Sequence, residues 1–121
     1  CSEKDVIPSH TLDLMGIRDE AAGDKIVYKG LGCDKCYNTG YKGRMPIFEI
    51  LQLDNELRSL IIEKESVEKI RRHVLTKKNF LNMREYGMMK VFQGNTTASE
   101  IIRVAPPNLP IRSFDEIMKL K

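Results

Sequence analysis

The feature that most constrains this chain is a cysteine loop, residues 32–44, with Cys33 and Cys36 at C-x-x-C spacing. This spacing lets two thiolates face one point, as a tetrahedral metal site requires. Glycines and a Thr-Gly pair follow at once, and they let the backbone curl so that N–H groups point at sulfur. The pair therefore supplies half of a metal site, and Cys1 is the one further cysteine of the chain.

The residues alone leave three interpretations of the Cys33/Cys36 pair open. A structural zinc site is favoured, with Cys1 as third ligand and a cysteine upstream of Cys1 as fourth; His10, Asp5, the terminal amine or water are alternative fourth ligands. A redox C-x-x-C opens a helix, whereas the Gly, Asn and Thr-Gly around this pair disfavour one. Two ordinary buried thiols are the third interpretation.

The composition is that of a soluble globular chain. A length of 121 residues fits one domain or two small subdomains, and 41% hydrophobic with 31% charged residues allows a modest core. A net charge of +3 is too weak to imply nucleic-acid binding, and no apolar run approaches the roughly 18 residues that span a bilayer. An odd number of cysteines fits poorly with a secreted disulfide framework, so metal chemistry in the cytosol is expected.

The local pattern predicts an α+β fold that begins with a small zinc-ribbon-like β-hairpin. Residues 1–24 are expected to be irregular, and residues 25–29 and 45–53 are expected to form two strands, since both are rich in β-branched and apolar residues. The cysteine loop lies between them, at the tip of the hairpin. Pro46 near the start of the second strand indicates an edge position, because proline donates no ladder hydrogen bond.

A small helical part is predicted to follow. Helices are expected over residues 54–64, 66–77 and from 82 to a stop at Gly94, then over about 97–105, with a short terminal helix from residue 113. Each starts at a residue that favours the N-cap, and three of them have capping-box form. These N-cap residues are Asp54, Ser66, Asn82, Thr97 and Ser113.

Basic side chains gather at two places, where solvated faces are the favoured interpretation. The alternative is a zinc-ribbon nucleic-acid-binding module, against which the mild charge and few aromatics weigh. The basic residues are Lys35, Lys42 and Arg44 beside the cysteines, and Arg71, Arg72, His73, Lys77 and Lys78 on a helix. The chain has no G-x-x-x-x-G-K-[ST] phosphate loop, no G-x-S-x-G and no H-E-x-x-H, so we expect no catalysis by this chain alone.

Three segments, in this order over residues 1–105, resemble the C-terminal part of the type II secretion and type IV pilus assembly ATPases (GspE/PilB). The first is Gly32-Cys33-x-x-Cys36-x-x-Thr39-Gly40-Tyr41-Lys42-Gly43-Arg44-x-x-Ile47-Phe48-Glu49-Ile50-Leu51. The others are Asp54, Leu57, Arg58 and Ile61, then Gly94, Thr96, Thr97, Glu100, Ile101, Arg103 and Val104. The loop also loosely resembles the cysteine repeats of DnaJ chaperones, but these occur several times in a chain, so a redox or chaperone role is a weaker alternative.

The family pattern also gives Cys1 a place. In that family a proline stands seven positions after the second cysteine of the first pair, and Cys1 and Pro8 have this spacing. If Cys1 were instead the first cysteine, position 4 would be Cys, and it is Lys4. Cys1 thus resembles the second member of a pair whose first member lies upstream. Pro46 departs from the family's usual glycine.

The resemblance implies that the parent protein is a cytoplasmic hexameric ATPase, peripheral to the inner membrane. Its expected partners are inner-membrane platform proteins of a secretion or pilus system and neighbouring subunits, with no nucleic acid and no membrane span. ATP and Mg would be bound by an upstream region, and zinc by Cys1, Cys33 and Cys36. The expected division is a zinc-motif subdomain over 1–53, a helical subdomain over 54–105 and an extension over 106–121, with a structural and docking role.

Overall fold

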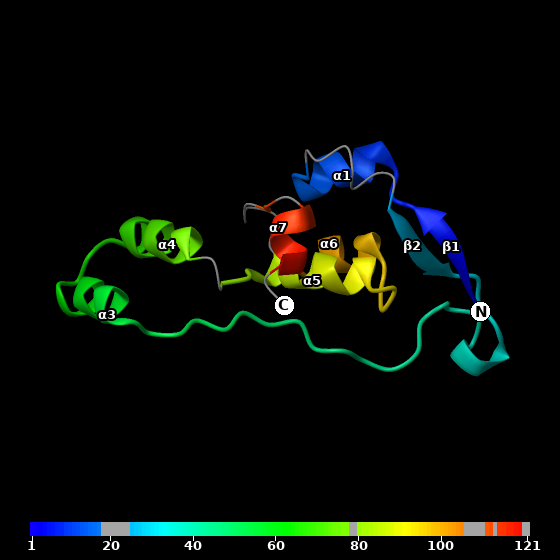
Figure 1. The fold of residues 1–121 in the computed structure, drawn as a ribbon. Helices are drawn as coiled ribbons and strands as arrows, with labels where there is room; N and C mark the ends of the chain where they lie inside the picture. The colour runs from blue at the N-terminus through cyan, green and yellow to red at the C-terminus, as the bar shows by residue number, and fades with distance from the viewer. Residues whose placement is uncertain (18–24, 78–79, 106–110, 113, 120–121) are drawn as a thin grey trace.

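The computed structural model describes residues 1–17, 25–77, 80–105, 111–112 and 114–119. These residues form an α+β fold with one two-stranded antiparallel sheet (Figure 1). The expected fold class is thereby confirmed. In chain order the elements are β1 (Ser2–Val6), α1 (Ser9–Met15), β2 (Ile26–Gly30), the 3-10 turn η1 (Asp34–Cys36), α3 (Asn55–Ile62), α4 (Val67–Thr76), α5 (Met83–Phe92), α6 (Ala98–Val104) and α7 (Phe114–Lys119).

The β-ribbon pairs two segments that lie about twenty residues apart in sequence. Its register joins Ser2 to Gly30 at one end and Val6 to Ile26 at the other. The strand predicted over 25–29 is confirmed as β2, but the prediction that residues 1–24 are irregular is wrong, because β1 and α1 both lie there. β1 consists mostly of polar residues and therefore lacks the apolar pattern that predicts a strand. Its polar side chains pair across the ribbon instead: Lys29 Nζ lies 3.1 Å from a carboxylate oxygen of Glu3.

The second predicted strand, over residues 45–53, is also wrong. In the described structure this segment is an extended chain without ladder pairing, and Figure 1 shows it running from the cysteine end towards α3. A β-prone sequence becomes a strand only when a partner backbone satisfies its hydrogen bonds. Here side chains hold part of the segment instead: the Phe48 ring lies 4.8 Å from the ring of Tyr86 on α5, and a Glu49 carboxylate oxygen accepts from Met83 N–H at 2.7 Å.

The predicted helices are confirmed together with most of their caps. The Asp54 carboxylate accepts from Leu57 N–H at 2.8 Å at the start of α3, and the Ser66 hydroxyl caps α4. At the start of α5 both hydrogen bonds of the capping box between Asn82 and Glu85 are present. At α6 the Thr97 side chain accepts from the Glu100 N–H, while the Glu100 carboxylate pairs with Arg103. Gly94 follows α5 with a φ of 77°, the left-handed conformation expected after a helix. The predicted N-cap at Ser113 lies outside the described residues.

Two hydrophobic clusters organise the described part of the fold. The smaller one holds the α3–α4 hairpin together through Leu57, Val74 and Phe80, and Figure 1 shows this hairpin apart from the other helices. The larger one joins the β-ribbon and α1 to α5 and α6, so residues from both sides of the predicted boundary at residue 53 share one core. Its buried members are Ile7, Leu12, Met15, Ile17, Val27, Met88, Val91, Ala98, Ile101 and Ala105.

Within the described residues, no helix has the length and apolar character needed to cross a bilayer.

Candidate metal centre

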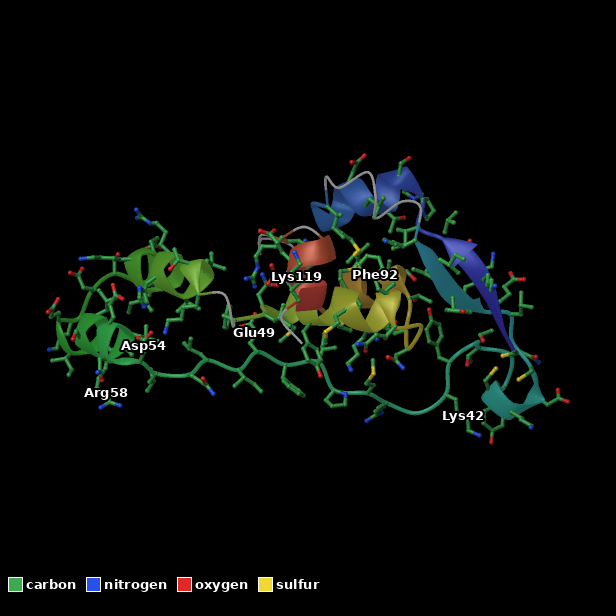
Figure 2. All side chains as sticks on the ribbon, viewed as in Figure 1. Lys42, Glu49, Asp54, Arg58, Phe92 and Lys119 are labelled. Carbon is green, nitrogen blue, oxygen red and sulfur yellow. The ribbon has the colours of Figure 1, made fainter. Side chains whose placement is uncertain are left out.

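The three cysteines meet at one end of the β-ribbon. Cys1 directly precedes β1, while Cys33 and Cys36 follow β2 around η1. Because the strands are antiparallel, the start of β1 and the end of β2 lie side by side. A further hydrogen bond from Leu31 N–H to the Cys1 carbonyl, at 2.8 Å, extends this pairing to the cysteine itself. Figure 2 shows sulfur atoms close together at this end of the molecule, near the labelled Lys42.

The spacing of the thiols suits a metal ion. The three Sγ atoms lie within 4.8 Å of one another, and Cys36 Sγ is 3.7 Å from both Cys1 Sγ and Cys33 Sγ. Two sulfurs that each lie about 2.3 Å from a tetrahedral zinc ion are about 3.8 Å apart. None of the three is in a disulfide, and Cys36 is buried while Cys1 is exposed. The predicted ligands therefore come together at a separation that thiolates around one zinc ion would have.

The backbone around Cys36 favours its thiolate. Burial raises the pKa of the Cys36 thiol, but N–H donors, Gly40 and Cys33 first among them, outweigh this and bring the pKa down to about 7. The Cys33 N–H lies 3.2 Å and the Gly40 N–H 3.3 Å from Cys36 Sγ. Such N–H···S contacts orient a sulfur ligand and stabilise its negative charge.

This loop conformation depends on left-handed residues and on one close backbone contact. Tyr37, Asn38 and Gly40 have φ values of 53°, 60° and 77°. The Thr39 hydroxyl donates to the Cys36 carbonyl at 2.6 Å, which closes the turn. Gly30 at the end of β2 packs directly on Gly40: a Cβ at position 30 would lie 2.2 Å from the Gly40 carbonyl oxygen. The glycines thus let the loop fold back onto the ribbon.

A contact that the sequence analysis did not single out connects the cysteine loop to the helices. The Tyr41 hydroxyl lies 2.6 Å from the Thr97 hydroxyl, which caps α6. The two residues are 56 positions apart, so no local pattern signals the contact. Both belong to the motif segments on which the family resemblance was based.

Two of the alternative fourth ligands, His10 and Asp5, lie away from the thiols. Among the described residues, the one group of His, Cys, Asp or Glu side chains close enough to hold a metal ion consists of the three cysteines. His10 is exposed on α1, where its ring lies 3.3 Å from the Thr11 hydroxyl, and Asp5 contacts Lys29 at 3.7 Å across the ribbon. Neither side chain joins the thiols.

The predicted basic face on α4 is only partly open. Arg71 and Arg72 are exposed, but Lys77 pairs with the Asp54 carboxylate and His73 lies 3.8 Å from the same group. Lys78 lies outside the described residues. Beside the cysteines, Lys35, Lys42 and Arg44 are exposed, as expected for a solvated rim.

A family model described as "Type II/IV secretion system protein" matches residues 2–103. The chain belongs to this family. The match covers the β-ribbon, the cysteine loop and the helices through most of α6, and it confirms the resemblance inferred from the three motif segments.

Characterised relatives agree with this assignment. The chain is 37% identical over 92 residues, 76% of its length, to the type IV pilus assembly ATPase PilB of Thermus thermophilus. It is 34% identical over 91 residues, 75% of its length, to the type II secretion system protein E of Pseudomonas aeruginosa, and 33% identical over 104 residues, 86% of its length, to PilB of the same organism. The matched parts make up 10%, 17% and 18% of those three proteins, so the chain corresponds to a small part of each.

Proposed function

We propose that this chain is the zinc-binding and helical C-terminal region of an ATPase that powers type II protein secretion or type IV pilus assembly. The observation that carries the proposal is the grouping of Cys1, Cys33 and Cys36 within 4.8 Å, in a chain that matches this family over residues 2–103. In this proposal the chain itself does not hydrolyse ATP. ATP and Mg are bound by a part of the protein outside it, in the cytoplasm at the inner membrane.

The proposed role of zinc is a cross-link. Three thiolates on one ion tie the start of β1 to the loop after β2, where residues 32–44 have little hydrophobic core of their own. The fourth ligand is a cysteine upstream of Cys1 or a solvent molecule. Because Tyr41 contacts the N-cap of α6, a fixed cysteine loop also helps to fix the position of α6.

The proposed role of the helices is docking. The extended segment and the α3–α4 hairpin leave large apolar side chains exposed, which is typical of a surface that contacts other proteins. They support contacts with neighbouring subunits of a hexamer or with platform proteins in the membrane. In the proposed division, 1–53 carries the metal and the extended part of this surface, 54–105 carries the docking helices and 106–121 is an extension. The exposed residues are Ile50, Leu51, Leu53, Ile61, Ile62 and Val67.

Metal content tests the zinc site. Purified chain is expected to hold about one zinc ion, and C33S/C36S to hold none, as measured by atomic emission. His10→Ala is the matched control, because it removes the histidine nearest in sequence to the first cysteine and is expected to leave zinc unchanged. Wild-type chain without zinc, or zinc retained by C33S/C36S, refutes the site; loss of zinc in His10→Ala would assign the fourth ligand differently.

A second experiment tests the docking role in the full-length protein. Ile62 is 72% exposed on α3, so Ile62→Asp is expected to weaken assembly or platform binding without lowering the Tm. Glu63→Ala, at an exposed polar position next to it, is the control. If the oligomer of the Ile62→Asp protein has the wild-type mass in light scattering and also binds the platform proteins as wild type does, docking by this hairpin is contradicted. ATP hydrolysis by the isolated chain at the rate of the whole protein would contradict the non-catalytic role.

A further inference from the structure

Glu85, in the first turn of α5, is an ionisable side chain with only 1% of its surface exposed. One of its carboxylate oxygens accepts from the Asn82 N–H at 3.1 Å, as the capping box requires. This single bond leaves most of the acceptor capacity of a buried carboxylate to be satisfied elsewhere. A buried carboxylate is tolerated only when a cation and further donors reach it.

Arg112 supplies that cation from beyond the family match. Its Nε lies 2.8 Å from one oxygen of Glu85, and a terminal guanidinium nitrogen lies 2.8 Å from the other. The Arg112 backbone N–H also donates to Glu85 at 3.0 Å. The result is a bidentate pair, the arrangement in which the planar guanidinium fits a carboxylate best.

A third acceptor completes the arrangement. The same terminal nitrogen of Arg112 donates to the Phe80 carbonyl, which precedes the N-cap of α5. The Arg112 side chain is 24% exposed, while its partner Glu85 is buried. A lysine ammonium at this place would face one oxygen at a time and would not span the carboxylate and the carbonyl together.

Apolar contacts accompany this polar anchor on the same segment. Ile111 packs against the larger hydrophobic cluster, and Ile117 on α7 is 1% exposed. α7 contacts α5, and Figure 1 shows the two helices lying against each other. The segment thus has one polar anchor, with the partly buried Ile111 before it and the buried Ile117 after it in sequence.

We propose that Glu85 and the Phe80 carbonyl form a guanidinium-binding site at the start of α5. This site binds Arg112 and so holds a C-terminal clasp, which consists of Ile111, Arg112 and α7. The family match ends at residue 103, so the arginine comes from outside the matched region. The clasp closes over the first turn of α5 and keeps the C-terminal segment docked there.

Hydrogen exchange of the α7 amides measures the clasp directly. Arg112→Ala leaves a buried carboxylate without its cation, so exchange in α7 is expected to accelerate about a hundredfold or more, the size typical of breaking a buried ion pair. Arg103→Ala is the matched control, because the Arg103–Glu100 pair has exposures of 69% and 35% and lies on the surface. Glu85→Gln keeps an oxygen for the Asn82 cap and is expected to release α7 as Arg112→Ala does.

Chemical rescue separates a guanidinium site from ordinary packing. Ethylguanidinium at millimolar concentration is expected to restore slow exchange in Arg112→Ala, and to leave wild type and Arg103→Ala unchanged. If Arg112→Ala does not fold, Arg112→Lys against Arg103→Lys decides, with faster α7 exchange expected only in the former. Unchanged α7 exchange in Arg112→Ala and Glu85→Gln would overturn the clasp, and failure of rescue in a released Arg112→Ala would overturn the guanidinium site.

Discussion

Gly30→Ala tests whether the contact between the β-ribbon and the cysteine loop positions the proposed zinc ligands. A Cβ at this position would lie 2.2 Å from the Gly40 carbonyl oxygen and 2.5 Å from the Gly40 Cα. Real Cβ contacts stay beyond 3.0 Å, so the backbone at Gly40 must retreat by about 0.8 Å. Gly40 N–H donates to Cys36 Sγ at 3.3 Å, and a displacement of this size lengthens that hydrogen bond past its useful range.

The expected loss of zinc affinity follows from this one bond. Removing a group that orients a metal ligand costs about 10–100-fold in metal affinity. This range equals about 1.4–2.8 kcal/mol, and it agrees with the roughly 1.5–3 kcal/mol of a hydrogen bond to a charged group. Gly30→Ala is therefore expected to bind zinc about 10–100-fold more weakly than wild type.

The assay is competition for zinc with a chelator of known affinity. Gly16→Ala is the control: its φ of 76° strains an alanine, but a Cβ there meets nothing within 4 Å, and the position lies in the turn after α1. It is expected to lower stability and leave zinc affinity unchanged. Zinc affinity of Gly30→Ala within about twofold of wild type, below the tenfold minimum expected here, would refute the positioning role of this contact.

Three further predictions concern the helices. Leu57 is fully buried in the small α3–α4 cluster, so Leu57→Ala is expected to lower the free energy of unfolding by about 2–3 kcal/mol, the low end of the range for such a change in a core. Hydrogen exchange that becomes faster in α3 and α4 alone would show this loss. A Cβ at Gly87 would lie 2.7 Å from Ile101 Cγ2; Gly87→Ala is expected to cost about 1–3 kcal/mol in urea unfolding, and strictly additive effects with Ile101→Val would contradict the clash. A hydrogen bond from Lys77, and a smaller contribution from the Leu57 N–H, lower the pKa of Asp54 in the folded chain. The ionised Asp54 therefore stabilises the fold above its unfolded pKa of about 3.9, and this stabilisation is lost as the pH falls through the folded pKa. Asp54→Asn keeps a good N-cap and is expected to abolish this acid-dependent loss of α3, as followed by exchange between about pH 2 and 6; an unchanged pH profile would contradict it.

The starts of the helices were predictable because they depend on local chemistry. A side-chain oxygen at the N-cap reaches an N–H two or three residues later, whatever the rest of the fold does. Asp54, Ser66 and Asn82 each do this in the structure as predicted. The C-x-x-C loop was predictable for the same reason, since Cys33, Cys36 and the turn between them lie within a few residues.

The strand pairing was not predictable from the same patterns, because a strand is defined by its partner. Residues 45–53 have the apolar composition of a strand, yet no described backbone pairs with them. Residues 2–6 have a polar, charged composition, yet they pair with β2. The signal that was available is charge complementarity: Glu3 and Asp5 both face Lys29 across the ribbon. The position of Cys1 beside the other cysteines follows from this pairing.

The first turn of α5 explains how parts of the chain that are not joined by strand pairing are held together. A helix N-terminus presents N–H groups without intrahelical partners and a partial positive charge. Here Glu49 of the extended segment accepts the first helical N–H at 2.7 Å, Arg84 donates to the Leu14 carbonyl of α1 at 3.3 Å, and Glu85 binds Arg112 of the C-terminal segment. Three successive helical positions thus contact three distant parts of the chain. Two of these contacts place a carboxylate at the positive end of the helix dipole, so the electrostatics that begin α5 also attach the extended and C-terminal segments to it.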